Sequence, residues 1–201
     1  MIKGLLRYFD VAYFLRFALL FVSLYYCHIL FNGVISREGN YYSPFLDHYL
    51  NYIQWFTLSI LHSAKFILQT VGVNSYIEGS QVLKAPSGLG VNLWLPCLGL
   101  GIISFWIAYI VSQKTSLKKK IGWCLGGITA IWFINCLRIA LLLLSLENGW
   151  GQNKVLDHHE VFNLAAYAVI FTFIVLFNRQ EQISNRNQLR ENASPREELA
   201  V

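Results

Sequence analysis

The sequence predicts an all-α, polytopic membrane protein with about five to six transmembrane helices, and three observations favour this fold class. Of its 201 residues, 55% are hydrophobic and only 13% are charged, whereas soluble domains carry about 25% charged residues. The mean hydropathy of the chain is +0.44. The apolar residues also gather into long stretches, and about 20 consecutive apolar residues are enough to span a bilayer.

Five stretches have the length expected of membrane spans. Because little sequence remains outside them, we expect one integral membrane domain over residues 1–178 and a polar, disordered cytoplasmic tail over residues 179–201. The first stretch is long and lacks a small-residue cleavage site, so we do not expect a cleaved signal peptide. The stretches are Ala12–Ile35, Tyr49–Val71, Leu95–Val111, Ile121–Leu146 and Val161–Asn178.

The net charge of +5 does not indicate nucleic-acid binding, because the basic residues gather at the ends of spans. Four lysines lie in Lys114–Lys120, and four arginines follow Asn178. Short basic loops stay in the cytoplasm. We therefore expect the lysine loop and the tail on the cytoplasmic side. Cys97 and the loop Glu147–Glu160 then lie on the extracytoplasmic side.

Counting backward through the first two spans places the N-terminus on the extracytoplasmic side. This expectation conflicts with the same charge rule, because Lys3, Arg7 and Arg16 lie near the N-terminus. A partly re-entrant N-terminal segment or one further span would remove the conflict. The sequence leaves these alternatives open.

Cys97 is the first candidate functional residue. It lies at the mouth of the third expected span, after Pro96 and before Gly99 and Gly101. A cysteine at such a mouth is accessible and can serve as a nucleophile, whereas a cysteine packed inside a span is inert. The four cysteines contain no Cys-x-x-Cys pair, so we do not expect a disulfide framework.

Arg138 is the second candidate, because ionisable side chains inside spans usually face a protein interior or a cavity. It follows Ile121 by 17 residues, which places it about 26 Å along the helix, near the outer face. A later start of the span would leave it about 10 Å deep. Asn135 lies three residues earlier and shares its face. An arginine that snorkels at the membrane edge is the alternative, but Leu141–Leu146 continues the apolar run beyond it.

The third candidate is His159, within the run Asp157–Glu160 at the start of the fifth expected span. Histidine acts as an acid, a base or a metal ligand near neutral pH. We expect no metal, because adjacent helical residues point about 100° apart and no second cluster supplies further ligands. The alternative is a purely structural role, in which Asp157 caps the N-terminus of the helix. Asn163 and Tyr167 follow His159 at helical spacing and extend a polar stripe.

Together these residues supply the chemistry of acyl transfer. A histidine within hydrogen-bond reach activates a thiol. An arginine stabilises a tetrahedral oxyanion or clamps a carboxylate. Cys97, Arg138 and His159 come from three spans and are expected in one plane near the outer face of the membrane. No cofactor is required for this reaction.

The ordered set of Cys97, Asn135 to Ile139 and His159 resembles the exosortase/archaeosortase family over roughly Val91 to Phe171. The resemblance implies a cysteine transpeptidase that cleaves C-terminal sorting signals, such as PEP-CTERM tails, and transfers the protein to a surface carrier. It also implies membrane-anchored substrates whose tail combines a motif, an apolar helix and a basic end.

In this resemblance Cys97 is the nucleophile, Arg138 the oxyanion or substrate clamp, and His159 the base and later acid. Asn135, Asn163 and His158 are possible supporting residues. The chain departs from the family in having Leu98 after the cysteine where Ser is usual. It also has Asn163 four residues after the histidine, where the family has Gly.

Two other classes of function fit the sequence less well. A non-catalytic transporter or assembly subunit would carry polar residues through the inner halves of its spans, but the inner halves of the third to fifth spans are almost purely apolar here. A serine or aspartyl intramembrane protease would need a Gly-x-Ser-x-Gly motif or paired aspartates within the spans, and the sequence has neither. The expected location is the inner membrane of the cell, with the site facing the extracytoplasmic side.

Overall fold

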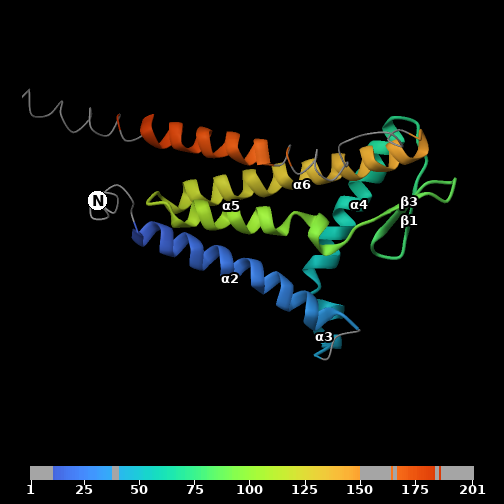
Figure 1. The fold of residues 1–201 in the computed structure, drawn as a ribbon, viewed down its shortest axis with the longest axis horizontal. Helices are drawn as coiled ribbons and strands as arrows, with labels where there is room; N and C mark the ends of the chain where they lie inside the picture. The colour runs from blue at the N-terminus through green and yellow to red at the C-terminus, as the bar shows by residue number, and fades with distance from the viewer. Residues whose placement is uncertain (1–10, 38–40, 150–163, 165–166, 184–185, 187–201) are drawn as a thin grey trace, which may run out of the picture. The chain divides into compact units, whose positions relative to one another are not determined.

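The computed structural model describes residues 11–37, 41–149, 164, 167–183 and 186, and the chain divides between residues 162 and 163 into two compact units. The second unit is helical over residues 167–183, so this helix runs five residues past the expected end of the fifth span. The elements of the first unit (Figure 1) are α2 (Val11–Ile35), α3 (Pro44–Tyr49), α4 (Tyr52–Thr70), β1 (Tyr76–Glu78), β2 (Val82–Lys84), β3 (Gly90–Asn92), the 3₁₀ helix η1 (Leu95–Leu98), α5 (Leu100–Ser112) and α6 (Leu117–Glu147).

Helices α2, α5 and α6 lie side by side in the first unit, with α5 in the middle (Figure 1). The side chain of Gln113 at the end of α5 donates to the Tyr13 hydroxyl at the start of α2, at 3.0 Å. Further along, Phe17 packs edge-on against Phe105 with ring centroids 5.3 Å apart. The later of the two residues in α2 contacts the earlier of the two residues in α5, so α2 is antiparallel to α5.

This orientation corrects the expected direction of the first span. The start of α2 lies at the same end as the Lys114–Lys120 loop, and its last turn, up to Ile35, lies at the end that carries Cys97. The sequence predicted the opposite direction, with the start of the first span at the Cys97 end. Of the basic residues named above, Arg16 lies in the described chain, near the start of α2, so it belongs to the same end of the unit as the lysine loop and no longer conflicts with it.

Helices α5 and α6 form an antiparallel hairpin with close packing at Gly127. The Trp106 indole donates to the backbone oxygen of Trp123 at 2.9 Å. A Cβ atom built on Gly127 would lie 1.9 Å from the Trp106 ring nitrogen, so the site has no room for one. Small residues permit this kind of approach between helices in membranes.

Helix α4 does not run from one end of the first unit to the other. At its start, the Tyr52 hydroxyl and Nδ1 of His28, in the later half of α2, share a hydrogen bond of 2.7 Å. Midway, Trp132 of α6 donates to the Ser59 hydroxyl at 3.0 Å. Its end leads into the sheet, whose β3 packs against α6. Both ends of α4 therefore lie toward the Cys97 end, so the stretch Tyr49–Val71 is not the full crossing that the sequence predicted.

The chain is mostly helical, as predicted, but the all-α expectation is wrong in one segment. Residues 76–92 form a three-stranded antiparallel sheet in the order β1-β2-β3. Its buried face carries Leu83 and Val91, while Lys84 and Asn92 point to the other face. The strands are three residues long, and Gly79 and Gly88 adopt positive φ of 62° and 89° in the two turns. Short strands in a mainly helical chain gave too weak a periodic signal for the sequence to predict them.

Among the described residues, two helices are long and apolar enough to cross a membrane, namely α2 and α6. Helix α5 is apolar but has only 13 residues, and it begins at Leu100 where the expected third span began at Leu95, because Leu95–Leu98 form η1 and Gly99 precedes the helix. This departure places Cys97 on a turn before the helix, outside the helix itself.

Candidate active site

The Cys97 thiol is carried by a short turn that ends just before α5. Pro96 lies in the first turn of η1, where its missing N–H leaves no donor unsatisfied. The turn closes when the Cys97 N–H donates to the Trp94 carbonyl at 2.8 Å. Gly99 then adopts a left-handed backbone conformation, with φ 72°, and caps α5, which begins at Leu100. Cys97 is half-buried, so its thiol is held by the fold yet remains accessible.

Asn135 of α6 fixes this turn from the neighbouring helix. Its side-chain amide, which is buried, donates to the Leu98 carbonyl at 2.9 Å. A Cβ atom at position 99 would lie 2.8 Å from that amide nitrogen. Glycine is therefore required at this position for two reasons. The left-handed backbone favours a residue without a Cβ atom, and the Asn135 amide occupies the space that a Cβ atom would need. In the sequence, Gly99 stands out only as a small residue close to Cys97, and no local pattern indicates this role.

Arg138 lies one turn beyond Asn135 on α6 and reaches the thiol. Its Nη2 lies 4.0 Å from Sγ of Cys97, with the N–H directed at the sulfur. The arginine is only 7% exposed, so it is enclosed by protein and does not extend along a membrane edge. The snorkelling alternative therefore does not describe this side chain. The fold brings together two of the three candidates, which lie 41 residues apart in the sequence.

The remaining candidates lie outside the described residues. These are His158, His159 and Asn163. Within the described ranges, no group of three or more His, Cys, Asp or Glu side chains is arranged to hold a metal ion. The described part of the site thus consists of a thiol, a guanidinium and an amide, which can supply a nucleophile and hydrogen-bond donors.

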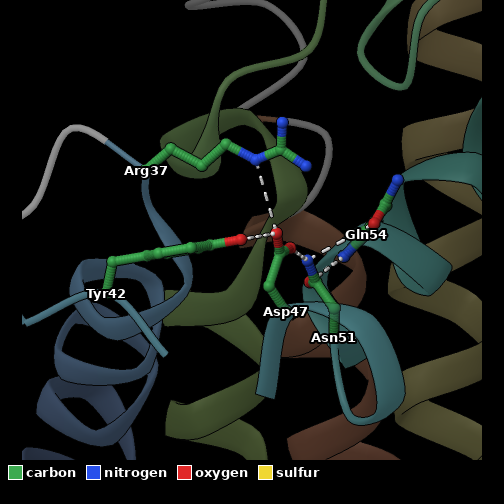
Figure 2. A network of polar contacts seen from close by, with 5 residues as sticks. All are labelled: Arg37, Tyr42, Asp47, Asn51 and Gln54. Carbon is green, nitrogen blue, oxygen red and sulfur yellow. Dashed lines mark hydrogen bonds and ion pairs between the residues drawn. The ribbon is translucent and has the colours of Figure 1, made fainter. Parts of the chain in front are cut away.

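A second polar cluster fixes the connection between α2 and α4 (Figure 2). At its centre, the Asp47 carboxylate accepts from the Tyr42 hydroxyl and from the Asn51 amide, both at 2.8 Å. Asn51 also caps α4 by accepting from the Gln54 N–H at 2.9 Å. The hydrogen bonds from Tyr42 and Asn51, together with the nearby Arg37 guanidinium, hold the pKa of Asp47 below its usual value. The cluster determines the start of α4, which in turn packs against α6.

Comparison with known proteins identifies the group to which this architecture belongs. Residues 41–176 match the family model described as transmembrane exosortase (Exosortase_EpsH), which is more than half of the chain. No curated protein and no solved structure shows a significant match.

Proposed function

The chain belongs to the transmembrane exosortase family, and from this premise we propose that it is a membrane-embedded cysteine transpeptidase. Its substrates would be exported proteins that end in a sorting signal of the PEP-CTERM kind, with a motif, an apolar helix and a basic end. The observation that carries the proposal is the 4.0 Å approach of Arg138 Nη2 to the Cys97 sulfur. The buried Arg138 guanidinium therefore holds hydrogen-bond donors beside the half-buried nucleophile, where negative charge develops during acyl transfer.

In the proposed reaction, the Cys97 sulfur attacks the carbonyl carbon of the scissile peptide bond. His159 takes the thiol proton and later delivers it to the leaving amine, as paired acid and base do in acyl transfer. Arg138 donates hydrogen bonds to the oxyanion of the tetrahedral intermediate or clamps a substrate carboxylate. Breaking the C–N bond leaves a thioester on Cys97 and releases the C-terminal helix.

The thioester is then resolved by a nucleophilic group of a surface carrier. That group attacks the same carbonyl carbon, loses its proton to His159 and displaces the Cys97 thiolate. Asn135 supports both steps by holding the Leu98 carbonyl, and hence the turn that carries the sulfur. Asn163 and His158 are proposed as further supporting residues.

We place the site on the extracytoplasmic side of the inner membrane. The lysine loop would lie in the cytoplasm, together with the start of α2. In this arrangement α2, α5 and α6 of the first unit cross the membrane. Helix α4 lies in the outer half against α6. Within the described part of the first unit, the stretch Tyr49–Val71 is therefore proposed not to be one of the five or six crossings that the apolar stretches predicted.

Replacement of single cysteines tests the proposal. In cells that carry Cys97→Ala, exported proteins should keep their C-terminal helices, which mass spectrometry of membrane fractions detects as intact C-terminal peptides. Cys27→Ala, Cys124→Ala and Cys136→Ala are matched controls and should process these proteins normally. Wild-type processing by Cys97→Ala at normal expression would refute the acyl-transfer mechanism and favour a non-catalytic membrane subunit.

A further inference from the structure

The edge strand β3 exposes backbone groups that the sheet does not use. On the side of β3 that faces β2, the hydrogen-bond ladder is complete. There the Leu93 N–H donates to the Gln81 carbonyl at 2.8 Å, and Val91 is paired with Leu83. In an antiparallel pair, alternate residues direct their N–H and C=O groups toward and away from the neighbour. The backbone groups of Gly90 and Asn92 therefore point away from β2, to the open edge.

Both residues are exposed, and their outward groups are free within the described part of the chain. Unpaired edges act as templates for another strand, and proteins usually block them with a charge, a proline or a bulge. The opposite edge strand, β1, carries Glu78 in an ion pair with Lys84. Strand β3 packs against α6, but it carries no charge, proline or bulge at its outward positions, which are the exposed residues Gly90 and Asn92.

The position of this edge connects it to the chemistry. Strand β3 ends at Asn92, and the chain continues through Leu93 and Trp94 into the turn that bears Cys97. Trp94 is 64% exposed and lies between β3 and Cys97 in the sequence. A peptide paired with β3 would thus pass over Trp94 before its next residues reach Cys97.

We propose that the substrate binds by adding a strand to β3, so that its sorting motif lies extended along Gly90–Asn92 and its scissile bond reaches Cys97. This inference rests on the proposed function, which supplies the substrate class. Main-chain hydrogen bonds would provide affinity, and contacts of alternate side chains would provide specificity. The exposed side chains of Asn92 and Trp94 are the specificity contacts on the enzyme.

The direction of the added strand follows from the membrane arrangement. A substrate with a basic cytoplasmic end runs from the outer to the inner face after its motif. The enzyme chain takes the same course, from β3 through Cys97 into α5. The substrate strand is therefore parallel to β3, and its C-terminal side lies nearer to Trp94 than to Gly90.

Site-specific photo-crosslinking tests both the edge and the direction. The probe is an epitope-tagged copy of an exported protein that retains its C-terminal helix in Cys97→Ala cells. In that background, p-benzoylphenylalanine replaces Asn92 or Trp94 in the intact membrane protein. Tyr76 is the matched control, because it is 45% exposed and lies on the same face of the sheet in the opposite edge strand, β1.

Crosslinks to the tagged protein from positions 92 and 94, at least tenfold above those from position 76, are expected. Mass spectrometry should place both on the N-terminal side of the substrate helix, with the position-94 crosslink closer to that helix. Equal crosslinking from position 76, or the reverse order along the substrate, would overturn the inference while leaving the proposed function intact. If no exported protein retains its helix in Cys97→Ala cells, the proposed function falls and this inference falls with it.

A backbone substitution gives an independent measurement. Asn92→Pro removes an outward N–H that β2 does not use, and edge strands tolerate proline. We expect it to slow cleavage of the same tagged protein by about tenfold, because a strand hydrogen bond is lost and the ring obstructs pairing. Asn92→Ala keeps the N–H and loses only the side-chain contact, so it should cleave the tagged protein faster than Asn92→Pro. Equal rates for the two variants, at equal membrane levels, would overturn strand addition.

Discussion

Asn135 and Leu98 are joined by a buried hydrogen bond from the amide nitrogen to the carbonyl oxygen, at 2.9 Å. The bond ties the turn before α5 to the middle of α6, across 37 residues of sequence. One turn further along α6, Arg138 meets the sulfur of Cys97. The relative position of the thiol and the guanidinium thus depends on a neutral amide that touches neither group.

Removing this amide should loosen the turn. Asn135→Ala leaves the Leu98 carbonyl without its donor, and an unsatisfied buried group costs about 1–3 kcal/mol. Gly99→Ala should also destabilise the protein, by about 1–2 kcal/mol for the left-handed backbone alone. Thermal unfolding of the purified protein in detergent measures both effects.

The double variant Gly99→Ala/Asn135→Ala discriminates further. Because a Cβ atom at position 99 would lie 2.8 Å from the Asn135 amide, removal of the amide relieves the clash. We therefore expect the double variant to lose less stability than the sum of the two single variants. Strict additivity would show that the two residues do not share the contact.

Arg138→Lys separates a hydrogen-bonding role from simple positive charge. The planar guanidinium presents paired donors that an ammonium group cannot reproduce. Loss of one donor to an oxyanion costs on the order of 100–1,000-fold in rate. We expect the variant to reach wild-type membrane levels but to cleave substrate at least about tenfold more slowly, measured by pulse-chase of a tagged exported protein. Near-normal cleavage would remove Arg138 from the catalytic machinery, and loss of the protein itself would indicate a structural role.

Neighbouring glycines in α6 should respond differently to alanine. Gly127→Ala places a methyl group against the Trp106 ring, and overpacking typically costs about 1–3 kcal/mol. Gly126 has no atom within 4 Å of an added Cβ, so Gly126→Ala should leave the melting temperature unchanged or higher. Equal melting temperatures for the two variants would mean that the α5–α6 contact differs from the one described.

The direction of α2 can be tested by labelling with a membrane-impermeant thiol reagent in a cysteine-free background. Ala12→Cys and Ser116→Cys should both be protected in intact cells, because the start of α2 lies at the lysine-loop end. Asn74→Cys, which is exposed near the sheet, should be labelled from outside. Labelling of position 12 together with position 74 would restore the opposite orientation of the first helix.

Acid should weaken the junction between α2 and α4 through Asp47. Its pKa is lower in the folded protein than the ordinary value of 3.8, so the stability that its charge contributes is present above that value. This contribution is lost as pH falls through the lower, folded pKa. Asp47→Asn should melt below wild type at pH 6, and the gap should narrow as the pH drops below 3.8. A gap that is independent of pH would show that the charge of Asp47 does not stabilise the junction.

The sequence by itself determined the class of protein and the candidate residues. Long apolar stretches predicted helices that agree with α2 and α6 within a few residues, because apolar length is a local property of the chain. Cys97 and Arg138 could also be singled out, since a cysteine at the mouth of a span and an arginine inside one are locally unusual.

Only the tertiary structure decided how these parts meet. The direction of α2, the position of α4 with both ends near the site, and the open edge of β3 depend on contacts between residues far apart in the sequence, such as Tyr13 with Gln113. Strands of three residues are also too short to show a period, and they form because Leu83 and Val91 are buried together. Apolar side chains indicate that a segment will be buried, but shape and hydrogen bonding between segments determine against which neighbour.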